Sequence, residues 1–240
     1  MINDRSFPDR ASLEKALAED IVRILSHAIE MRGTAVFLVS GGSSPRGVYN
    51  VLSQADIDWS RVYVALVDER WVSSDHEASN EMFIRKNLLT GAAAKAHLVG
   101  MKTSAADVHE GLAECEQRYA ALPARPDVCL LGMGSDGHTA SLFPHATGLE
   151  EAIALPVSQA SQVKPPRCAA IDAIPSAVTG PYTQRMTVTL DYLSSARKRL
   201  LLITGAEKRS VYEMARAGVD ISDMPVRALF GFPLDVFWAP

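Results

Sequence analysis

The sequence has few cysteines, no long apolar run and no excess of charge of one sign. Its three cysteines, Cys115, Cys129 and Cys168, are widely spaced and form no C-x-x-C pair. This pattern is typical of inert thiols in a reducing compartment rather than of a disulfide scaffold or a metal site. No segment approaches the roughly 18 consecutive apolar residues of a membrane-spanning helix, and residues 1–33 lack the apolar core of a signal peptide. We therefore expect a cytoplasmic protein that does not bind membranes.

The charge balance also argues against nucleic acid as a partner. Lys and Arg number 24 and Asp and Glu 28, which gives a net charge of −4 and a pI of about 5.9. An anionic ligand would need a few well placed cations, because no general basic surface is indicated. The composition is 48% hydrophobic and 22% charged, as in ordinary globular proteins. No internal repeat or low-complexity linker divides the chain, so residues 1–240 are expected to form one domain.

Helical and strand patterns alternate along most of the chain. Continuous apolar runs predict buried strands and amphipathic segments predict helices. This alternation predicts an α/β fold, a doubly wound and largely parallel sheet with helices on both faces. Residues 154–184, rich in Pro, Ser, Ala and Gln, are expected to form a long surface loop. The expected helices are 12–31, 46–53, 79–89, 107–122 and 207–218, and the expected strands are 34–39, 62–67, 96–100, 127–134, 185–190, 196–205, 225–230 and 236–239.

Four polar motifs follow predicted strands, where ligands bind in open parallel sheets. They are SGGSSP (40–45), DERWV (68–72), GMGSDGH (132–138) and TGAEK (204–208). The first motif precedes a helix that is expected to begin with Ser44 as N-cap and Pro45 at its first position. Its free backbone N–H groups favour a phosphate or an oxyanion, although an ordinary strand-to-helix turn has the same composition.

The DERWV motif offers Arg70 as a planar clamp for a phosphate. The alternative is that Asp68 or Glu69 neutralises this arginine. The following segment, 75–81, contains Asp, His and Glu in succession, which cannot all face one metal ion from a regular element. We interpret it as a solvated loop in which Asn80 is the one expected ligand contact.

Lys208 is expected in the first turn of a helix, where its charge opposes the helix dipole. Such a position favours a lysine that faces an anion. Glu207 is a local alternative partner for the same charge.

The segment 132–145, GMGSDGHTASLFPH, has two interpretations. Its glycines match the G-x-G-x-x-G spacing that holds a dinucleotide pyrophosphate. That fingerprint normally opens a long helix and precedes, about 20 residues later, an acidic residue at a strand end. Here Pro144 permits only a short helix, and no apolar strand precedes the acidic residues at 150–151. The sequence therefore argues against a nucleotide.

A catalytic role for His138 fits this segment better. The ordinary imidazole pKa of roughly 6.5 suits a general base near neutral pH. Asp136, two residues earlier, is placed to orient the ring. The alternative is a structural histidine beside a turn.

Taken in order along the chain, these motifs resemble the 6-phosphogluconolactonases of the pentose phosphate pathway. That family shares its Rossmann-like fold with the aminosugar-6-phosphate isomerases, in which D-E-Y replaces DER and D-G-H continues with I-A-F-N-E. The segment DGHTASLF lacks the acidic residue that those enzymes place soon after the histidine, which favours a hydrolase. The matching segments are SGGSSPRGVY, VDERWVSSDHEASNEMFIRKNLL, LLGMGSDGHTASLFPH, RMTVTL, ITGAEKR, PVRAL and VFWAP.

The resemblance implies a set of site residues. It implies that His138 is the general base, with Asp136 beside it, and that neither a metal nor a redox cofactor takes part. Arg167 and Arg185 are both candidates for the family arginine, and Arg185 is preferred because it directly precedes MTVTL. The substrate-binding residues that it implies are Ser40, Gly41, Gly42, Asp68, Arg70, Asn80, Gly134, Arg185 and Lys208.

The activity that the resemblance implies is hydrolysis of 6-phosphoglucono-1,5-lactone to 6-phosphogluconate, a step of carbohydrate metabolism. Backbone N–H groups of a glycine-rich turn are expected to meet the oxygen that gains charge. The expected partner is a small phosphorylated sugar lactone, and the expected assembly is a monomer or a weak homodimer. Two alternatives remain, an aminosugar-6-phosphate deaminase and a non-catalytic sugar-phosphate sensor, the latter disfavoured because the sequence shows no helix-turn-helix or basic patch.

Overall fold

A computed structural model describes residues 1–156 and 165–240 of the chain. Two sheets organise these residues, a seven-stranded sheet of order β1-β10-β9-β6-β2-β3-β5 and a three-stranded sheet of order β4-β8-β7. The strands are β1 (Ile2–Ser6), β2 (Ala35–Val39), β3 (Val62–Leu66), β4 (Asp68–Arg70), β5 (His97–Val99), β6 (Val128–Gly132), β7 (Cys168–Asp172), β8 (Gln184–Val188), β9 (Lys198–Thr204) and β10 (Leu234–Ala239).

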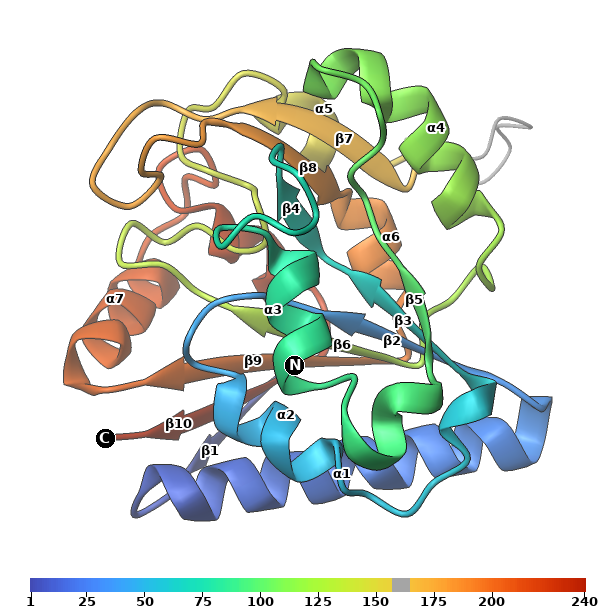
Figure 1. Cartoon of the computed structure of the whole chain (residues 1–240). Coiled ribbons are helices and arrows are strands. Elements are labelled where there is room, and N and C mark those ends of the chain that lie inside the picture. Colours follow the sequence, from blue (N-terminus) through green and yellow to red (C-terminus); the bar gives the residue numbers. More distant parts are fainter. Residues whose placement is uncertain (157–164) are drawn as a thin grey trace.

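Helices cover the larger sheet on both faces. In Figure 1, α1 and α2 lie below this sheet, and the small sheet lies above it with α4, α5 and α6. The α-helices are α1 (Arg10–Arg32), α2 (Arg46–Leu52), α3 (Asn80–Asn87), α4 (Val108–Ala120), α5 (Leu149–Ile153), α6 (Leu190–Ser195) and α7 (Ala206–Ala217); short 3₁₀ helices are η1 (Trp59–Arg61), η2 (Gly91–Lys95) and η3 (Pro225–Gly231).

Every pairing in the larger sheet is parallel, which confirms the expected α/β fold. The strand order reverses between the neighbours β2 and β6, because the chain runs outward from β2 through β3 to β5 and then returns to the other side of β2. In such sheets the crevice beyond the carboxyl ends of the strands at the reversal is the usual ligand site. The topology therefore places a candidate site where 40–45 and 132–143 emerge.

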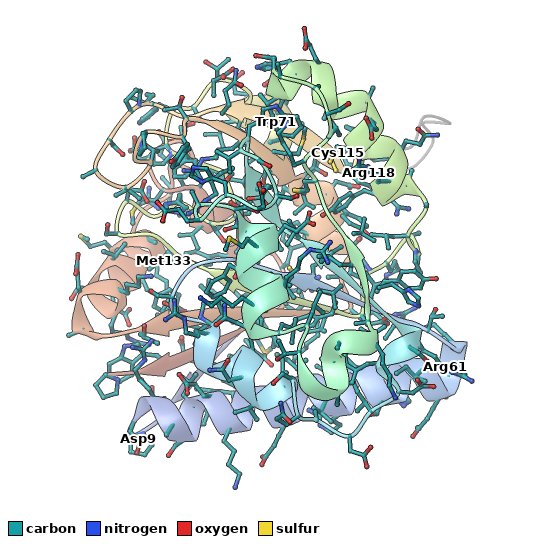
Figure 2. All side chains as sticks on the ribbon, viewed as in Figure 1. Asp9, Arg61, Trp71, Cys115, Arg118 and Met133 are labelled. Atoms are coloured by element: carbon teal, nitrogen blue, oxygen red, sulfur yellow. The ribbon has the colours of Figure 1, made fainter. Side chains whose placement is uncertain are left out.

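Burial explains the regular elements. All five residues of β2 are buried, as a strand covered on both faces requires. Helix α1 buries one stripe that includes Leu13, Leu17 and Ile21, and each such side chain stabilises the fold by about 1.5–3 kcal/mol. The Asp9 side chain caps the start of α1 by accepting from the N–H of Ser12 at 2.7 Å (Figure 2). All three cysteines are buried free thiols.

The structure corrects several expected elements. Residues 225–230 form the 3₁₀ helix η3 rather than a strand; Pro225 opens it and has no N–H to donate to a sheet. Strand β7 lies inside the expected loop 154–184, of which 157–164 fall outside the described residues. Strand β1 is polar and half-exposed, and its apolar pattern was too weak to predict.

The expected helix starts near the site also need correction. Ser44 does not cap α2. Pro45 occupies the N-cap position of this helix, and no side chain accepts a hydrogen bond from the N–H groups of its first turn. The Ser44 Oγ lies 3.4 Å from Thr204 Oγ1 instead, so the loop between β2 and α2 contacts the end of β9. No helix follows Gly137 until α5 begins at Leu149. His138 therefore lies in a loop and not at the start of a helix.

Candidate active site

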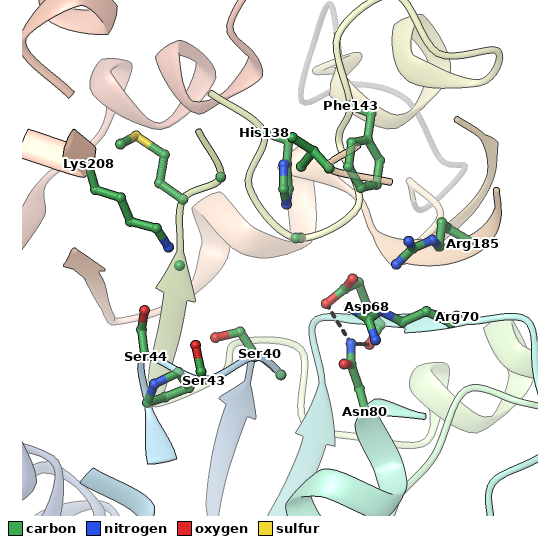
Figure 3. A pocket seen from close by; sticks show the side chains of 18 residues that line it. Ser40, Ser43, Ser44, Asp68, Arg70, Asn80, His138, Phe143, Arg185 and Lys208 are labelled. Carbon is green, nitrogen blue, oxygen red and sulfur yellow. Dashed lines mark hydrogen bonds between the residues drawn. The ribbon is translucent and has the colours of Figure 1, made fainter. Parts of the chain in front are cut away.

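A cavity of about 240 Å³ opens beyond the carboxyl ends of β2, β6 and β9, with the small sheet as one wall (Figure 3). Nearly all of the site residues expected from sequence line it. Asp136 is the exception, and it contacts the cavity through His138. The expected residues that line the cavity are Ser40, Gly41, Gly42, Asp68, Arg70, Asn80, Gly134, His138, Arg185 and Lys208.

His138 and Asp136 form a hydrogen-bonded pair at the cavity. The His138 Nδ1 lies 2.6 Å from Asp136 Oδ1, and the same oxygen accepts the His138 backbone N–H at 3.1 Å. Burial alone would raise the pKa of Asp136, but the hydrogen bond and charge of His138 outweigh it and lower this pKa below the ordinary value. An ionised Asp136 holds the proton on Nδ1 and leaves Nε2 as the nitrogen able to accept a proton.

Two neighbours fix the imidazole ring in place. The ring of Phe143 packs against it at a centroid distance of 4.3 Å. Gly134 leaves room on the other side, since a Cβ at this position would lie 2.1 Å from His138 Nδ1 and 2.6 Å from Asp136 Oδ1. The sequence G-S-D-G-H therefore places a small residue where the dyad needs space.

Three backbone N–H groups of the turn with His138 make hydrogen bonds within that turn. The Gly134 N–H donates to the His138 carbonyl oxygen at 2.9 Å, and the Gly137 N–H donates to the Gly134 carbonyl oxygen at 3.1 Å. The third is the His138 N–H, which donates to Asp136 Oδ1 at 3.1 Å. Gly134 therefore lines the cavity without a free donor of its own.

The loop between β2 and α2 keeps free donors. In the described part of the chain, no backbone hydrogen bond uses the N–H of Gly41 or Gly42. The Ser40 Oγ is also buried without a hydrogen-bond partner among the described residues. Gly42 has φ +90°, and a Cβ on Gly41 would lie 2.0 Å from Asn80 Oδ1, so both glycines are required by geometry. The free groups of this loop can therefore donate hydrogen bonds to an anionic or carbonyl oxygen.

Lys208 enters the cavity from the first turn of α7. Figure 3 shows its side chain directed toward the loop that carries Ser43 and Ser44. Burial lowers the pKa of Lys208, an effect that the Arg10 charge adds to and the Glu207 charge opposes. A bound anion would favour the charged form of this lysine.

Asp68, the first residue of β4, is hydrogen-bonded to Asn80, the first residue of α3. The Asn80 Nδ2 donates to the Asp68 backbone oxygen at 2.9 Å and to its Oδ1 at 3.1 Å. Glu69 turns away from the cavity and accepts the backbone N–H groups of Asn80 and Glu81 and the Ser79 hydroxyl. Burial raises the pKa of Glu69 despite these bonds. Its role in holding the start of α3 was not foreseen from sequence.

Arg70 and Arg185 come from the facing strands β4 and β8. The Arg70 guanidinium donates to the Ala78 carbonyl oxygen at 2.6 Å, and its Nε is buried without a partner among the described residues. The guanidinium therefore makes no hydrogen bond to Asp68 or Glu69, the alternative that the sequence left open; only the Arg70 backbone N–H donates to Glu69 Oε1, at 2.8 Å. Arg185 donates to the carbonyl oxygens of Tyr182 and Thr179.

Arg167 lies elsewhere in the fold. Its guanidinium donates to the carbonyl oxygens of Tyr119 and Leu122 and stacks over Tyr192. Of the two candidate arginines, Arg185 is the one that lines the cavity.

Other features of the sequence have structural explanations. His76 accepts the Ala78 N–H at 3.0 Å and packs edge-on against Tyr182. Within residues 1–156 and 165–240, no group of three or more His, Cys, Asp or Glu side chains could hold a metal ion. Over the same residues, no helix is long and apolar enough to cross a membrane. The cavity also has apolar lining residues that no sequence pattern indicated, Met133, Ala140, Phe143 and Val178.

Known proteins resemble this chain over nearly its whole length. The family model described as "Glucosamine-6-phosphate isomerases/6-phosphogluconolactonase" matches residues 8–238. A 6-phosphogluconolactonase of Rhizobium meliloti (strain 1021) is 39% identical over 241 residues, 99% of each chain. One from Pseudomonas putida is 39% identical over 232 residues, 97% of this chain and 90% of its own.

A solved structure agrees over the whole length. The crystal structure of a 6-phosphogluconolactonase from Shewanella baltica OS155 has a TM-score of 0.90 and 36% identity, and the match covers 100% of this chain and 98% of the other. The family match and the relatives each extend over nearly every element described above. The chain therefore belongs to the glucosamine-6-phosphate isomerase/6-phosphogluconolactonase family.

Proposed function

We propose that this chain is a 6-phosphogluconolactonase that hydrolyses 6-phosphoglucono-1,5-lactone to 6-phosphogluconate. The observation that carries the proposal is the His138–Asp136 pair at a polar cavity lined by three cationic side chains, Arg70, Arg185 and Lys208. The close relatives named above support the same reaction.

The cationic side chains bind the phosphate group. Guanidinium groups suit a phosphate because their donors lie in one plane, and Lys208 adds a point charge from α7. The free N–H groups of Gly41 and Gly42 lie in the same cavity and are left for the lactone carbonyl oxygen. Binding of the phosphate group holds the lactone ring in place for the reaction.

His138 carries out the proton transfers. Its Nε2 takes a proton from a water molecule as the water oxygen bonds to C1 of the lactone. The carbonyl oxygen gains negative charge, and backbone N–H groups of the β2–α2 loop stabilise it. The bond between C1 and the ring oxygen then breaks, and the ring oxygen takes the proton from protonated His138. The product is the open-chain acid, which ionises at neutral pH.

Asp136 keeps this histidine ready for the first step. Its carboxylate holds the Nδ1 proton and stabilises the imidazolium that forms when Nε2 accepts a proton. General base catalysis of this kind contributes roughly 10²–10⁴-fold.

The residues of the cavity argue against the isomerase reaction of the wider family. Among the described residues that line it, Asp68 is the one carboxylate. The stretch after His138 supplies Ala140 and Phe143 to the cavity, both without an acidic group. An aminosugar-6-phosphate deaminase would need the acidic residue that this loop lacks.

The test measures product formation by coupling 6-phosphogluconate to 6-phosphogluconate dehydrogenase and following NADPH. The lactone also opens without a catalyst, so the rate is compared with a reaction lacking protein. An enzyme-dependent rate supports the proposal. Ammonia release from glucosamine 6-phosphate would identify the deaminase instead, and ligand-induced stabilisation without turnover would identify a sensor.

A further inference from the structure

Ser141 holds the carboxylate of Asp68 from outside the cavity. Its side chain is fully buried, and its Oγ donates to Asp68 Oδ2 at 2.6 Å. Asn80 donates to the other carboxylate oxygen, Oδ1, at 3.1 Å. Asp68 is 7% exposed and lines the cavity, whereas Ser141 does not reach it. Each oxygen of this carboxylate therefore has one fixed donor and further lone pairs for a ligand.

The backbone around Ser141 is shaped for this contact. Ala140 has φ +49°, in the left-handed region that residues other than glycine seldom adopt. The next N–H, that of Ser141, donates to Thr187 Oγ1 at 3.3 Å. Thr187 is the residue opposite Asp68 in the pairing of β4 with β8. The unusual conformation at Ala140 turns Ser141 onto both facing strands.

The same loop carries His138. Two residues, Thr139 and Ala140, separate His138 from Ser141, and a short antiparallel bridge between Thr139 and Leu142 closes the turn that contains Ser141. The loop is therefore attached to the small sheet, and the strands concerned are those of Arg70 and Arg185. A buried hydroxyl thus joins the element with the general base to the elements with the cationic groups.

We propose that Ser141 is a positioning residue for lactone hydrolysis and acts through Asp68. By fixing Oδ2, it aims a carboxylate lone pair at a hydroxyl group of the sugar, and Asp68 accepts that hydrogen bond in the bound state. Ser141 makes no contact with the substrate. The inference rests on the proposed function and adds a determinant of substrate binding to it.

A double-mutant cycle tests this relation. The variants are Ser141→Ala, Asp68→Ala and the double variant, each assayed for kcat and KM in the coupled lactonase assay. Ser141→Ala is expected to raise KM by about tenfold and to change kcat by less than about threefold, because Asp68 loses the donor that fixes its Oδ2. In the Asp68→Ala background, removing the Ser141 hydroxyl is expected to change KM no further.

Thr189→Ala serves as the matched control. Thr189 is 2% exposed, and its hydroxyl donates to the Pro166 carbonyl oxygen at 2.7 Å, away from the cavity. This variant also removes a buried hydroxyl, so thermal unfolding of all variants shows the loss of stability that such a change causes. It is expected to lower the Tm and leave KM at the wild-type value.

The outcomes separate the inference from the proposed function. If wild-type protein shows no lactonase activity, the proposed function is wrong and this inference falls with it. If wild-type protein is active and Ser141→Ala keeps its KM, or the two single effects multiply in the double variant, the inference alone is overturned. A raised KM that vanishes in the Asp68→Ala background supports it.

Discussion

Arg70 and Arg185 lie directly opposite each other where β4 pairs with β8, and both line the cavity. Burial lowers the pKa of Arg185 to about 10, and the charge of Arg70 contributes to the shift, while Asp68 and Glu69 oppose it. Both guanidinium groups donate to backbone carbonyl oxygens, which are neutral and do not cancel their positive charge. A bound anion would compensate for this charge. The free protein is expected to hold these like charges together at some cost in stability.

Replacing Arg70 by Met should therefore weaken anion binding more than it destabilises the fold. We expect 6-phosphogluconate to raise the Tm of wild-type protein and to raise that of Arg70→Met much less. A tenfold loss of affinity reduces the stabilisation at excess ligand by about 1.4 kcal/mol. Arg61→Met, which removes an exposed arginine of η1, should keep the full ligand effect. Equal Tm shifts in both variants would show that Arg70 does not bind the anion.

The lowered pKa of Lys208 gives a prediction for alkaline pH. Because burial lowers this pKa, Lys208 loses its proton at a lower pH than an ordinary lysine, and its charge on the phosphate is lost first. Calorimetric affinity for 6-phosphogluconate should fall from neutral to alkaline pH in wild-type protein and stay nearly constant in Lys208→Arg. Lys102→Arg, whose parent lysine also has a pKa lowered by burial but lies outside the cavity, should keep the wild-type profile.

Gly134→Ala should disrupt the His138–Asp136 pair without removing either side chain. The new Cβ would meet His138 Nδ1 at 2.1 Å, so the ring must move away from Asp136. We expect kcat to fall by roughly 10²-fold, toward the effect of losing a general base. Gly231→Ala has no heavy atom within 4 Å of its Cβ and should retain the wild-type kcat. If Gly134→Ala kept normal kcat, the close packing at this glycine would have no functional role.

Asp136→Asn should reduce turnover and should also weaken the dependence of the free energy of unfolding on pH in the acidic range. The neutral amide cannot stabilise protonated His138 as a carboxylate does, so kcat should fall by at least about tenfold. The folded pKa of Asp136 lies below its ordinary value, so this group stabilises the fold above its unfolded pKa and loses that effect as pH falls through the folded pKa. Urea unfolding across the acidic range should show a flatter pH dependence in Asp136→Asn. An unchanged slope would contradict the linkage.

The sequence predicted the elements with strong patterns and the residues that follow them. Buried strands such as β2 and β9 are nearly continuous apolar runs, and the polar motifs at their carboxyl ends had to meet at one edge of a parallel sheet. This is why residues as distant as Ser40, His138 and Lys208 were placed in one site from sequence.

Weaker patterns depend on tertiary pairing and were missed or misassigned. Strand β4 has three residues, Asp68–Arg70, and is a strand because β8 lies beside it. The apolar run 225–230 suggested a strand, but Pro225 and its neighbours turn into η3. The hydrogen bond from Ser141 to Asp68 joins residues 73 positions apart, and no local pattern indicates it.

The most direct test of the proposed role of His138 is the kcat of His138→Gln in the coupled lactonase assay, measured above the spontaneous rate. If His138 is the general base, kcat falls by roughly 10²–10⁴-fold while the affinity for 6-phosphogluconate stays close to that of wild-type protein. A variant that hydrolyses the lactone at the wild-type rate would show that His138 is not the general base.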